Sequence, residues 1–434
     1  MTVRKKALDA YTTVIDEGGY SNLVINKIIN DSQFSSEDRA LFTEIVYGSI
    51  SRKLTLEYYL RPFIKTKLKR WQRHLLIVSI YQLEFLDKIP SYAVINEAVE
   101  IAKEGGGKQD GNKINAILRS YLREEKQKIS DIKSDIKNDK KRLSIQYSMP
   151  LWIVDHLMRH YSIYEVENIL NELLKRPNMY VRVNRKLTSR DELLEKFSRE
   201  GITALKSDIH ENAIIVKGGG ITDSNLYREG LFGIQDASSM CVNYALDPSG
   251  NELILDACSA PGGKGFHALE NMDGHVDFSD IFEHKLTLID NESKRLKHTN
   301  LNILLKDATT DSYDKIYDKI IVDAPCSGLG VVKRKPEIKY NLKKEDIDSL
   351  VDIQLSILHH VKEFLKPGGI LVYSTCTIHQ MENENVAYTF KKQSDDIEFG
   401  EFEIPHFKFK GNHRQILPHE FNTDGFFIAK FKKL

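Results

Sequence analysis

Apolar residues recur at helical spacing throughout the first 125 residues of the chain. In the first such segment Ala7, Leu8, Tyr11, Val14 and Ile15 fall on one face. Further helices are predicted over residues 35–50, 71–86, 91–104 and 112–125. The run 71–86 is apolar nearly all round, which is typical of the central helix of a bundle. The pattern predicts an all-helical N-terminal domain.

The pattern changes between residues 126 and 222. The stretch "KQKISDIKSDIKNDKKR" (126–142) has few large apolar residues and predicts an exposed linker or a solvated helix. Beyond it, helices are predicted at 148–161, 164–175 and 190–201, and strands at 179–184 and 213–220. This grouping predicts a small α+β subdomain, of the RRM-like sort that handles RNA.

Short β-rich runs alternate with helices in the last two hundred residues. Strands are predicted at 253–258, 275–280, 303–308, 319–325 and 369–375, and helices at 283–298 and 345–366. The alternation predicts a mostly parallel sheet with helices on both faces. Residues 396–404 and 425–433 would add an antiparallel pair. The chain is therefore expected to be multidomain, with a helical domain (1–128), a linker and helical connector (129–162), an α+β subdomain (163–222) and an α/β domain (223–434).

Charge is balanced overall, with 62 basic and 62 acidic residues, but unevenly spread. The first 130 residues hold 21 Lys and Arg against 16 Asp and Glu. The segment 61–74 contains six cations and no acid: Arg61, Lys65, Lys67, Lys69, Arg70 and Arg73. Such a cluster suits contacts to nucleic-acid phosphates. A solvated helix face is the alternative interpretation of this one segment.

Several function classes are disfavoured by what the sequence lacks. No window approaches the roughly 18 uninterrupted apolar residues of a membrane helix. The N-terminus has no apolar core of the kind a secretion signal needs. The four cysteines include no CxxC pair, which argues against a disulfide framework or a zinc ribbon. We expect a cytoplasmic protein with no metal and no membrane partner.

The loop after the first predicted strand, "CSAPGGKG" (258–265), is a candidate ligand site. Ligands of open α/β sheets bind beyond the carboxyl ends of the strands. The loop is neither GxGxxG nor a Walker motif, so it indicates neither a dinucleotide nor a triphosphate. Gly262 and Gly263 would let a ligand approach the backbone closely. A tight strand-to-helix turn is the alternative.

Three acids end successive predicted strands: Asp280, Asp307 and Asp323. An acid at the end of the second strand can accept hydrogen bonds from ribose hydroxyls. The run "DFSD" (277–280) offers two acids, and we assign the role to Asp280. Each acid alone could cap a helix or a turn. Together they indicate a ligand with sugar hydroxyls, an amino-bearing base and positive charge, a description that S-adenosylmethionine fits.

Two cysteines also follow strands, Cys326 in "DAPCSGLG" (323–330) and Cys376 in "YSTCT" (373–377). A structural cysteine is usually a small buried hydrophobe, which is our interpretation of the thiols of Cys241 and Cys258. Cys326 and Cys376 lie instead where ligands meet the sheet. A metal pair is the rival interpretation, but neither thiol has a nearby His or Cys in sequence.

The motifs "DACSAPGGK", "DAPCSGLGVVKRKPEIKY" and "GGILVYSTCT" resemble those of the RNA cytosine-5 methyltransferases. The stretches "FGIQDASS" (232–239) and "DGFFIAKF" (424–431) are similar to that family too. The N-terminal "RALFTEIVYGSISRK" (39–53) resembles the NusB RNA-binding domain. The resemblance runs nearly end to end. It implies a NusB-like bundle joined to a Rossmann-like class I methyltransferase sheet, a combination that resembles bacterial enzymes acting on 16S rRNA.

The resemblance also implies roles for individual residues. Cys376 would add to carbon 6 of cytosine, Cys326 would assist product release, and Asp323 would contact the base, the cofactor or both. S-adenosylmethionine would be held by Cys258, Ser259, Ala260, Pro261, Gly262, Gly263, Lys264, Asp280, Asp307 and Asp323. Ser259 stands where alanine is common in the family. RNA contacts are expected at Arg182, Lys333, Arg334 and Lys335 besides the 61–74 cluster.

Two other classes remain as alternatives. One is an RNA-binding assembly or antitermination factor with an inactive catalytic module, against which the intact Cys326 and Cys376 count. The other is a DNA methyltransferase, whose nucleophile would be the "PC" cysteine; the "TC" cysteine argues against it. We expect a monomer that acts on 16S rRNA, naked or in an early small-subunit particle, and not on DNA. The sequence does not indicate which cytosine is modified.

Overall fold

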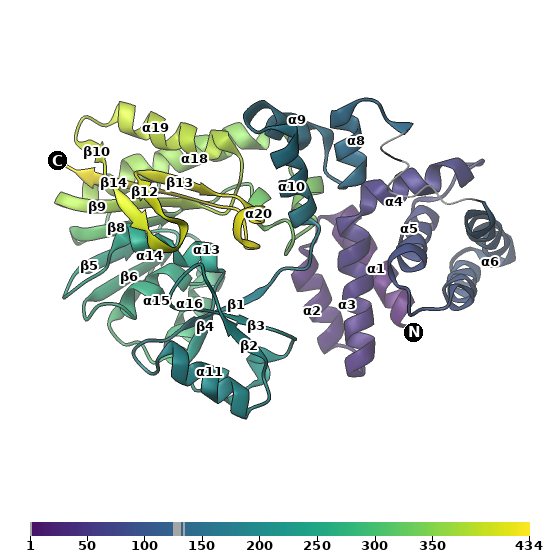
Figure 1. Ribbon diagram of the computed structural model, residues 1–434, viewed down its shortest axis with the longest axis horizontal. Coiled ribbons are helices and arrows are strands. Elements are labelled where there is room, and N and C mark those ends of the chain that lie inside the picture. The colour runs from purple at the N-terminus through teal and green to yellow at the C-terminus, as the bar shows by residue number, and fades with distance from the viewer. Residues whose placement is uncertain (1, 125–131, 133–134) are drawn as a thin grey trace. The chain divides into compact units, whose positions relative to one another are not determined.

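The computed structural model describes residues 2–124, 132 and 135–434. It forms two compact units (Figure 1). The first comprises Met1–Lys175 with Val332–Leu342, and the second comprises Arg176–Val331 with Lys343–Leu434. Among the helices of these described residues, none combines the length and the apolar character needed to span a bilayer.

The first unit is helical, as predicted. Its elements are α1 (Val3–Glu17), α2 (Ser21–Asn30), α3 (Ser36–Ser51), α4 (Lys53–Leu60), η1 (Arg61–Phe63), α5 (Arg70–Phe85), α6 (Ser91–Arg123), α8 (Asp139–Gln146), α9 (Leu151–His160) and α10 (Ile163–Leu173). Helix α5 buries an unbroken run of side chains, 74–82, which confirms it as the central helix. The two helices predicted at 91–104 and 112–125 form one element, α6, which is interrupted at Gly107 with φ of 80°.

The predicted linker 126–142 lies partly outside the described residues, at 125–131 and 133–134. In its described part residues 135 and 137–141 are exposed, as predicted, whereas Ile132 and Arg142 are buried. Ile132 packs in the apolar core of the helical unit, and Leu143 on α8 is also fully buried. Arg142 is buried beside them because its guanidinium pairs with Glu167 at 2.7 Å. A few apolar residues and the ion pairs of Arg142 with Glu167 and Asp139 hold this end of the segment on the core.

The segment Val332–Leu342 belongs to the helical unit although it follows the "PC" loop in sequence. Glu337 is buried and accepts hydrogen bonds from the backbone and hydroxyl of Ser21, at 3.0 and 2.6 Å. The ammonium of Lys339 donates to the carbonyl of Ser51 at 2.8 Å, and burial lowers the pKa of Lys339 to about 7. Buried polar groups with partners hold this segment in one place.

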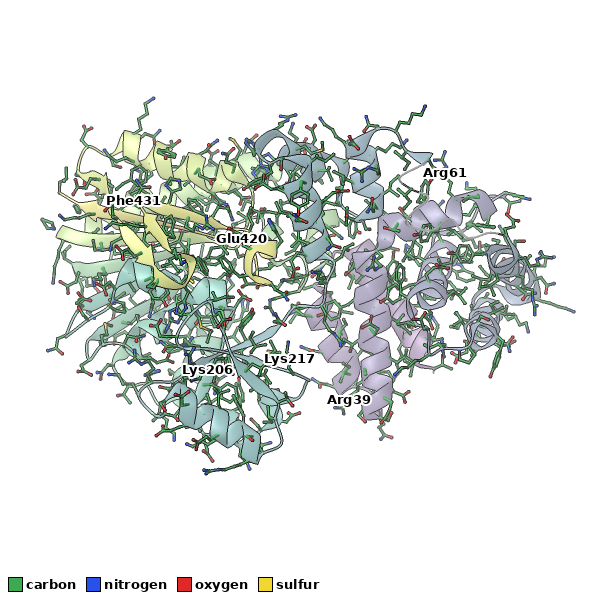
Figure 2. The ribbon with its side chains drawn as sticks, in the orientation of Figure 1. Arg39, Arg61, Lys206, Lys217, Glu420 and Phe431 are labelled. Carbon is green, nitrogen blue, oxygen red and sulfur yellow. The ribbon has the colours of Figure 1, made fainter. Side chains whose placement is uncertain are left out.

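The second unit begins with a small α+β sheet of order β2-β3-β1-β4. Its elements are β1 (Met179–Val183), α11 (Arg190–Arg199), β2 (Ala204–Lys206), β3 (Ala213–Val216), η2 (Ile221–Asp223), α12 (Asn225–Arg228) and β4 (Phe232–Ile234). The predicted strands 179–184 and 213–220 and helix 190–201 are confirmed. The strands β2 and β4 were not predicted, because each has only three residues and so short a run shows no recognisable alternation of apolar and polar positions. Exposed lysines on this part include Lys206 and Lys217 (Figure 2).

The larger sheet has the order β10-β14-β9-β8-β5-β6-β7, with β13 also paired to β14. Its strands are β5 (Leu253–Asp256), β6 (His275–Asp280), β7 (Leu301–Leu305), β8 (Tyr317–Asp323), β9 (Leu365–Thr375), β10 (Ile397–Phe399), β13 (His413–Ile416) and β14 (Phe426–Lys433). Strands β5 to β9 run parallel, whereas β14 is antiparallel to β9. The predicted antiparallel end is confirmed by the pairing of Ile397 with Lys433. The chain reverses its direction of strand addition at β5, so the sheet has its switch point there.

Helices cover both faces of this sheet, as predicted (Figure 1). One face carries α14 (Val242–Leu246), α15 (Gly263–Leu269) and α16 (Glu283–Leu296); the other carries α18 (Asp346–Val361) and α19 (Glu384–Gln393). Successive residues of a strand point to opposite faces. Ile254 therefore packs on the α14–α16 side and Leu255 on the α18–α19 side. Burial on both faces explains why these strands read as continuous apolar runs.

Candidate active site

The loop between β5 and α15 is shaped by its glycines. Gly262 has φ of 100°, and a Cβ there would lie 2.4 Å from the ring of Phe266. At Gly265 a Cβ would lie 2.4 Å from the ring of Phe278. Ser259 fixes the loop to β6, since its backbone and hydroxyl both donate to the carbonyl of Ser279 at 2.9 Å. Only small residues allow this close approach of backbone and ring.

A buried acid that the sequence analysis missed, Asp256, lies under this loop. Its Oδ2 accepts a hydrogen bond from the backbone of Gly265 at 3.0 Å. Its Oδ1 is buried and has no hydrogen-bond partner within the described residues. Burial is the main cause that raises the pKa of Asp256 to about 7. Its place as an acid at the end of an apolar strand is the signal that could have identified it.

The acids assigned at strand ends lie at this carboxyl edge. Asp280 is buried; its Oδ1 accepts from the backbone of Phe282 at 3.2 Å and lies 3.4 Å from the ammonium of Lys285. Asp307 accepts from both the hydroxyl and the backbone of Thr309, and these hydrogen bonds lower the pKa of Asp307. Both carboxylates therefore have fixed positions beyond their strands.

Asp323 links the loop after β5 to the end of β9. Its Oδ2 lies 2.6 Å from the ammonium of Lys264, and its Oδ1 accepts from the hydroxyl of Ser374 at 2.9 Å. Ser374 is two residues before Cys376. The ion pair and the hydrogen bond hold the side chain of Asp323 between the glycine loop and the cysteine loop. Ser374 was not among the predicted site residues, because a serine inside a strand carries no pattern of its own.

The sulfur atoms of Cys326 and Cys376 lie 3.4 Å apart. Each residue is half-buried, and all four cysteines, which the structure describes in full, are free thiols. The hydrogen bond to Cys376 is the first cause, and burial the second, that raises the pKa of Cys326 well above its ordinary value. Cys326 therefore keeps its proton and can donate it in a hydrogen bond to the sulfur of Cys376.

The two cysteine loops are joined by the residues that follow each thiol. The hydroxyls of Ser327 and Thr377 lie 2.7 Å apart and are both buried. The backbone of Ser327 donates to the carboxylate of Glu382 at 2.8 Å, and burial raises the pKa of Glu382. At Gly330 the backbone donates to the carbonyl of Cys376 at 3.0 Å, and a Cβ there would meet a carbonyl oxygen at 2.0 Å. These contacts fix the separation of the two sulfurs.

The remaining cysteines lie among apolar side chains. Cys241 is fully buried in the core, and burial raises its pKa well above the ordinary value. Cys258 is half-buried against the α18–α19 face, and burial raises its pKa too. High pKa values leave both sulfurs as unreactive thiols.

All six cations of the segment 61–74 are exposed, which keeps the prediction of phosphate contacts open. Two of them already pair with acids: Lys69 with Asp110 at 2.9 Å and Arg70 with Asp16 at 2.7 Å. In the same way Lys335 is exposed and Arg334 half-buried, so RNA contact by either residue stays a prediction.

Two predicted RNA contacts, Arg182 and Lys333, are wrong in this structure. Arg182 is 1% exposed and donates to both carboxylate oxygens of Glu270 at 2.7 Å and to the carbonyl of Gly263 at 2.8 Å. The ammonium of Lys333 is buried and lies 3.3 Å from the carboxylate of Glu172. A phosphate cannot reach either cation, since each is enclosed with its acid. Charge in a sequence does not reveal burial when the compensating acid is distant in the chain.

The strand order, the antiparallel β14 and the glycine loop at the switch point define an α/β methyltransferase domain. The family model "16S rRNA methyltransferase RsmB/F" matches residues 243–432. The NusB family model matches residues 1–123, and a model of the ferredoxin-like domain of RsmF/B-like methyltransferases matches 149–221.

Relatives of known name match over the whole length. The chain is 40% identical to "Probable ribosomal RNA small subunit methyltransferase B" of Bacillus subtilis (strain 168), over 100% of this chain and 99% of that one. It is 33% identical to "Ribosomal RNA small subunit methyltransferase B" of Proteus mirabilis (strain HI4320), over 99% and 98% of the two chains. The chain belongs to the RsmB/F family of 16S rRNA methyltransferases.

Solved structures share the fold. The crystal structure of PH0851 covers 99% of this chain and 98% of its own, with a TM-score of 0.82 and 22% identity. A methyltransferase homolog protein from Pyrococcus horikoshii covers 69% of this chain and 100% of its own, with a TM-score of 0.59 and 26% identity. The helical bundle, the small α+β subdomain and the methyltransferase sheet predicted from the sequence are confirmed, and the family model describes the small subdomain as ferredoxin-like.

Proposed function

We propose that this chain transfers a methyl group from S-adenosylmethionine to carbon 5 of a cytosine in 16S rRNA, through a transient bond between Cys376 and carbon 6. The observation that carries the proposal is the pair of sulfurs 3.4 Å apart at the carboxyl edge of the sheet. Membership of a 16S rRNA methyltransferase family supplies the substrate class. Two free thiols beside a carboxylate suit covalent chemistry at a pyrimidine ring better than binding alone.

The residues of the loop after β5 fit S-adenosylmethionine. Gly262 and Gly263 have no side chains to cover the backbone where α15 begins, so a ligand could approach that backbone closely. Asp280 would accept hydrogen bonds from the ribose hydroxyls of S-adenosylmethionine, and Asp307 would contact the amino-bearing base of the same cofactor. The unpartnered Oδ1 of Asp256 leaves one further acceptor beneath the loop. When bound, S-adenosylmethionine supplies an electrophilic methyl group.

Cys376 would act as the nucleophile because carbon 5 of cytosine is too weakly nucleophilic by itself. Addition of the thiolate to carbon 6 forms an S–C bond and moves the ring electrons onto carbon 5. The thiolate is the reactive form, and a hydrogen bond from the thiol of Cys326 would stabilise it. The raised pKa of Cys326 supports this division of roles, since Cys326 keeps its proton and can donate it in a hydrogen bond.

Asp323 would orient the ring during the addition. Its carboxylate is held in place by Lys264 and Ser374. The carboxylate would accept a hydrogen bond from a proton on N3 or from the exocyclic amino group of cytosine, and protonation at N3 favours attack at carbon 6. The target base must leave any stacked context before it can meet the thiol.

Product release would involve Cys326. After methylation the proton on carbon 5 must pass to a base, its electron pair re-forms the ring double bond, and the S–C bond breaks. The leaving group is the Cys376 thiolate, and the Cys326 thiol at 3.4 Å can donate a hydrogen bond to it. Stabilising the leaving sulfur speeds its departure.

The test is transfer of labelled methyl from S-adenosylmethionine to deproteinised small-subunit rRNA, with DNA of matched length as the control. We expect label in RNA alone, recovered as 5-methylcytidine after digestion to nucleosides. Label in another nucleoside would refute carbon 5 of cytosine, and label in DNA would refute the choice of RNA.

A further inference from the structure

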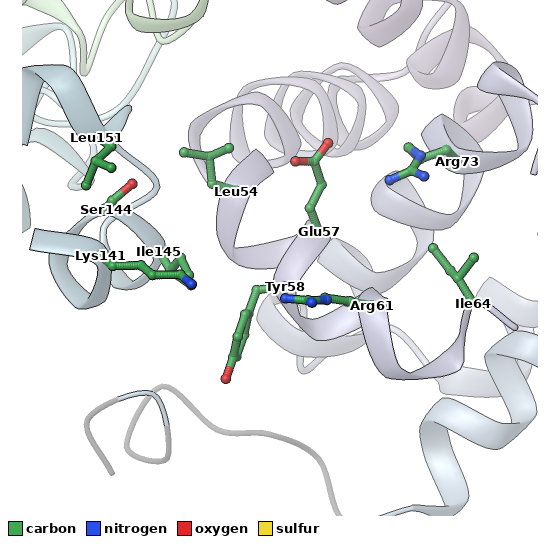
Figure 3. A pocket seen from close by; sticks show the side chains of 10 residues that line it. All are labelled: Leu54, Glu57, Tyr58, Arg61, Ile64, Arg73, Lys141, Ser144, Ile145 and Leu151. Atoms are coloured by element: carbon green, nitrogen blue, oxygen red, sulfur yellow. The ribbon is translucent and has the colours of Figure 1, made fainter. Parts of the chain in front are cut away.

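A hollow of about 720 Å³ opens on the helical unit, between the α4–η1 turn and α8 (Figure 3). It brings together cations from three separate segments: Arg61 at the end of α4, Arg73 on α5 and Lys141 on α8. Tyr58 lines the same hollow, and Figure 3 shows Arg61 and Lys141 directed toward it from opposite sides. The rest of the wall is largely apolar, with Leu54 among its members.

The two walls of the hollow are fastened to each other. The hydroxyl of Thr55 on α4 donates to the carbonyl of Ile145 on α8 at 2.6 Å. The backbone of Leu54 donates to the hydroxyl of Ser148 at 2.8 Å. Both bonds lie within the helical unit. The hollow is therefore preformed, as small-molecule and base-binding sites usually are.

The hollow is electropositive. Within the described residues, Arg61, Arg73 and Lys141 form no ion pair with any acid. The one carboxylate in the lining, Glu57, is paired with Lys53 one turn earlier at 3.1 Å. The hydroxyl of Tyr58 lies 3.5 Å from the carboxylate of Asp135. Unpaired guanidinium groups favour phosphate, which they can bind with two parallel hydrogen bonds.

We propose that this hollow binds one nucleotide of a single-stranded RNA segment, with its base against Tyr58 and its phosphates on Arg61, Arg73 and Lys141. Proteins recognise unpaired RNA by combining an aromatic or guanidinium plane for the base with cations for the backbone. An aromatic ring, three cations and an apolar wall around one cavity supply that combination. The proposal deepens the proposed function by assigning a contact for its RNA substrate, and it rests on that function for the identity of the RNA.

A nucleotide within a chain fits better than a free one. Exposed Lys65 and Lys67 follow Arg61 in the same segment, beyond the hollow, and can meet phosphates on either side of the bound nucleotide. A free nucleotide would use the same groups, so the experiment must separate these two sources.

The test measures binding of a fluorescein-labelled single-stranded decaribonucleotide to the full chain, by anisotropy, with no methyl donor present. The variant Arg61→Gln/Arg73→Gln removes two cations of the hollow. Its matched control, Lys65→Gln/Lys67→Gln, removes two cations of the same segment that lie outside it. Tyr58→Leu removes the ring, and Tyr58→Phe keeps it. Thermal melting of each variant verifies that the chain is folded.

We expect Arg61→Gln/Arg73→Gln, called the hollow pair, to weaken RNA binding by about tenfold or more. It should also lower the slope of log Kd against log salt concentration by about 1.4, because two cations are removed. Tyr58→Leu should weaken binding about fivefold or more at an unchanged slope, whereas Tyr58→Phe should match the parent chain. The control pair should weaken binding by a smaller factor than the hollow pair. Equal losses for the two charge pairs, together with no loss for Tyr58→Leu, would overturn the proposal.

Competition distinguishes the ligand sources. Cytidine or adenosine monophosphate at millimolar concentration should displace the oligomer only weakly if the hollow holds a nucleotide within a chain. Tight binding of a monophosphate that the hollow pair abolishes, with oligomer binding unaltered, would assign the hollow to a free nucleotide and overturn the RNA proposal. Since no methylation is measured, failure of the proposed reaction would leave these results unaffected.

Discussion

The carboxyl edge of the sheet and the hollow on the helical unit hold their charges in different ways. At the sheet edge, Asp323 is bonded to both Lys264 and Ser374, and the two sulfurs are fixed by hydrogen bonds behind them. In the hollow, Arg61 and Arg73 are exposed and form no ion pair within the described residues. The polar groups of the sheet edge are thus paired with one another, whereas the cations of the hollow are exposed to solvent.

The difference teaches what kind of ligand each region suits. Groups that are buried and bonded keep one geometry, which a reaction at a defined atom needs. Exposed cations on long side chains adapt to a flexible polymer, and their contribution is electrostatic and weakened by salt. Substitutions at the sheet edge should therefore act sharply on the reaction, whereas those in the hollow should act gradually on RNA affinity.

The largest effect is expected from Cys376→Ala. Without the nucleophile the S–C bond cannot form, so the rate of methylation should fall by at least about a thousandfold. Affinity for S-adenosylmethionine, measured by calorimetry, should remain near that of the parent chain. Substantial remaining activity would remove Cys376 as the nucleophile.

Asp323→Asn comes next. Loss of a charged group that orients the base should lower kcat/KM by about 10²–10⁴-fold, the usual range for general acid–base groups. Asp307→Asn is the matched control beyond the end of β7, at the same carboxyl edge of the sheet, and its effect should be confined to the KM for S-adenosylmethionine. If the two variants had equal effects on kcat, Asp323 would contact S-adenosylmethionine rather than the target cytosine.

Arg182→Met tests the correction of a predicted RNA contact. The substitution leaves the buried carboxylate of Glu270 unpaired, and it should lower the free energy of unfolding by about 3–5 kcal/mol. Arg185→Met, at an exposed position two residues beyond the end of β1, should change it by less than about 0.5 kcal/mol. Chemical denaturation measures both values. A stable Arg182→Met chain with weakened RNA binding would restore the original assignment.

The smallest effect is expected from the hydroxyl pair behind the thiols. Ser327→Ala and Thr377→Val each remove one partner of the 2.7 Å contact. A slight displacement of one sulfur should lower kcat by about tenfold while leaving KM unchanged. The double variant should be no slower than either single variant, because both remove the same interaction. Independent, additive losses would show that the contact does not position the thiols.

Much of the catalytic region could be predicted because its chemistry sits in short contiguous motifs after apolar strands. The strand ends at Asp280 and Asp323 and the glycine loop after β5 were found from periodicity and the rule for open sheets. Asp256 was missed because the same apolar run that marks the strand hides an acid at its end. Ser374 was missed because its role depends on a contact with Asp323, the last residue of the neighbouring strand β8.

The basic residues were harder to interpret, since their roles depend on partners far away in sequence. Arg182 pairs with Glu270, which is 88 residues away in sequence, and Lys333 pairs with Glu172, which is 161 residues away. The cluster 61–74 was predicted as one surface, but only Arg61 and Arg73 of its cations line the hollow, within the described residues. Lys141, their partner there, lies in a segment that the sequence presents as a solvated linker.

The most direct measurement of the central claim uses Cys326→Ala with substrate rRNA and S-adenosylmethionine, analysed on a denaturing gel. Since release of the Cys376 sulfur is impaired, we predict an RNA–protein band that survives heat and detergent, and a cross-linked peptide containing Cys376 after digestion. The double variant Cys326→Ala/Cys376→Ala should give no such band. An absent band in the single variant, or a cross-link on another residue, would contradict the covalent mechanism.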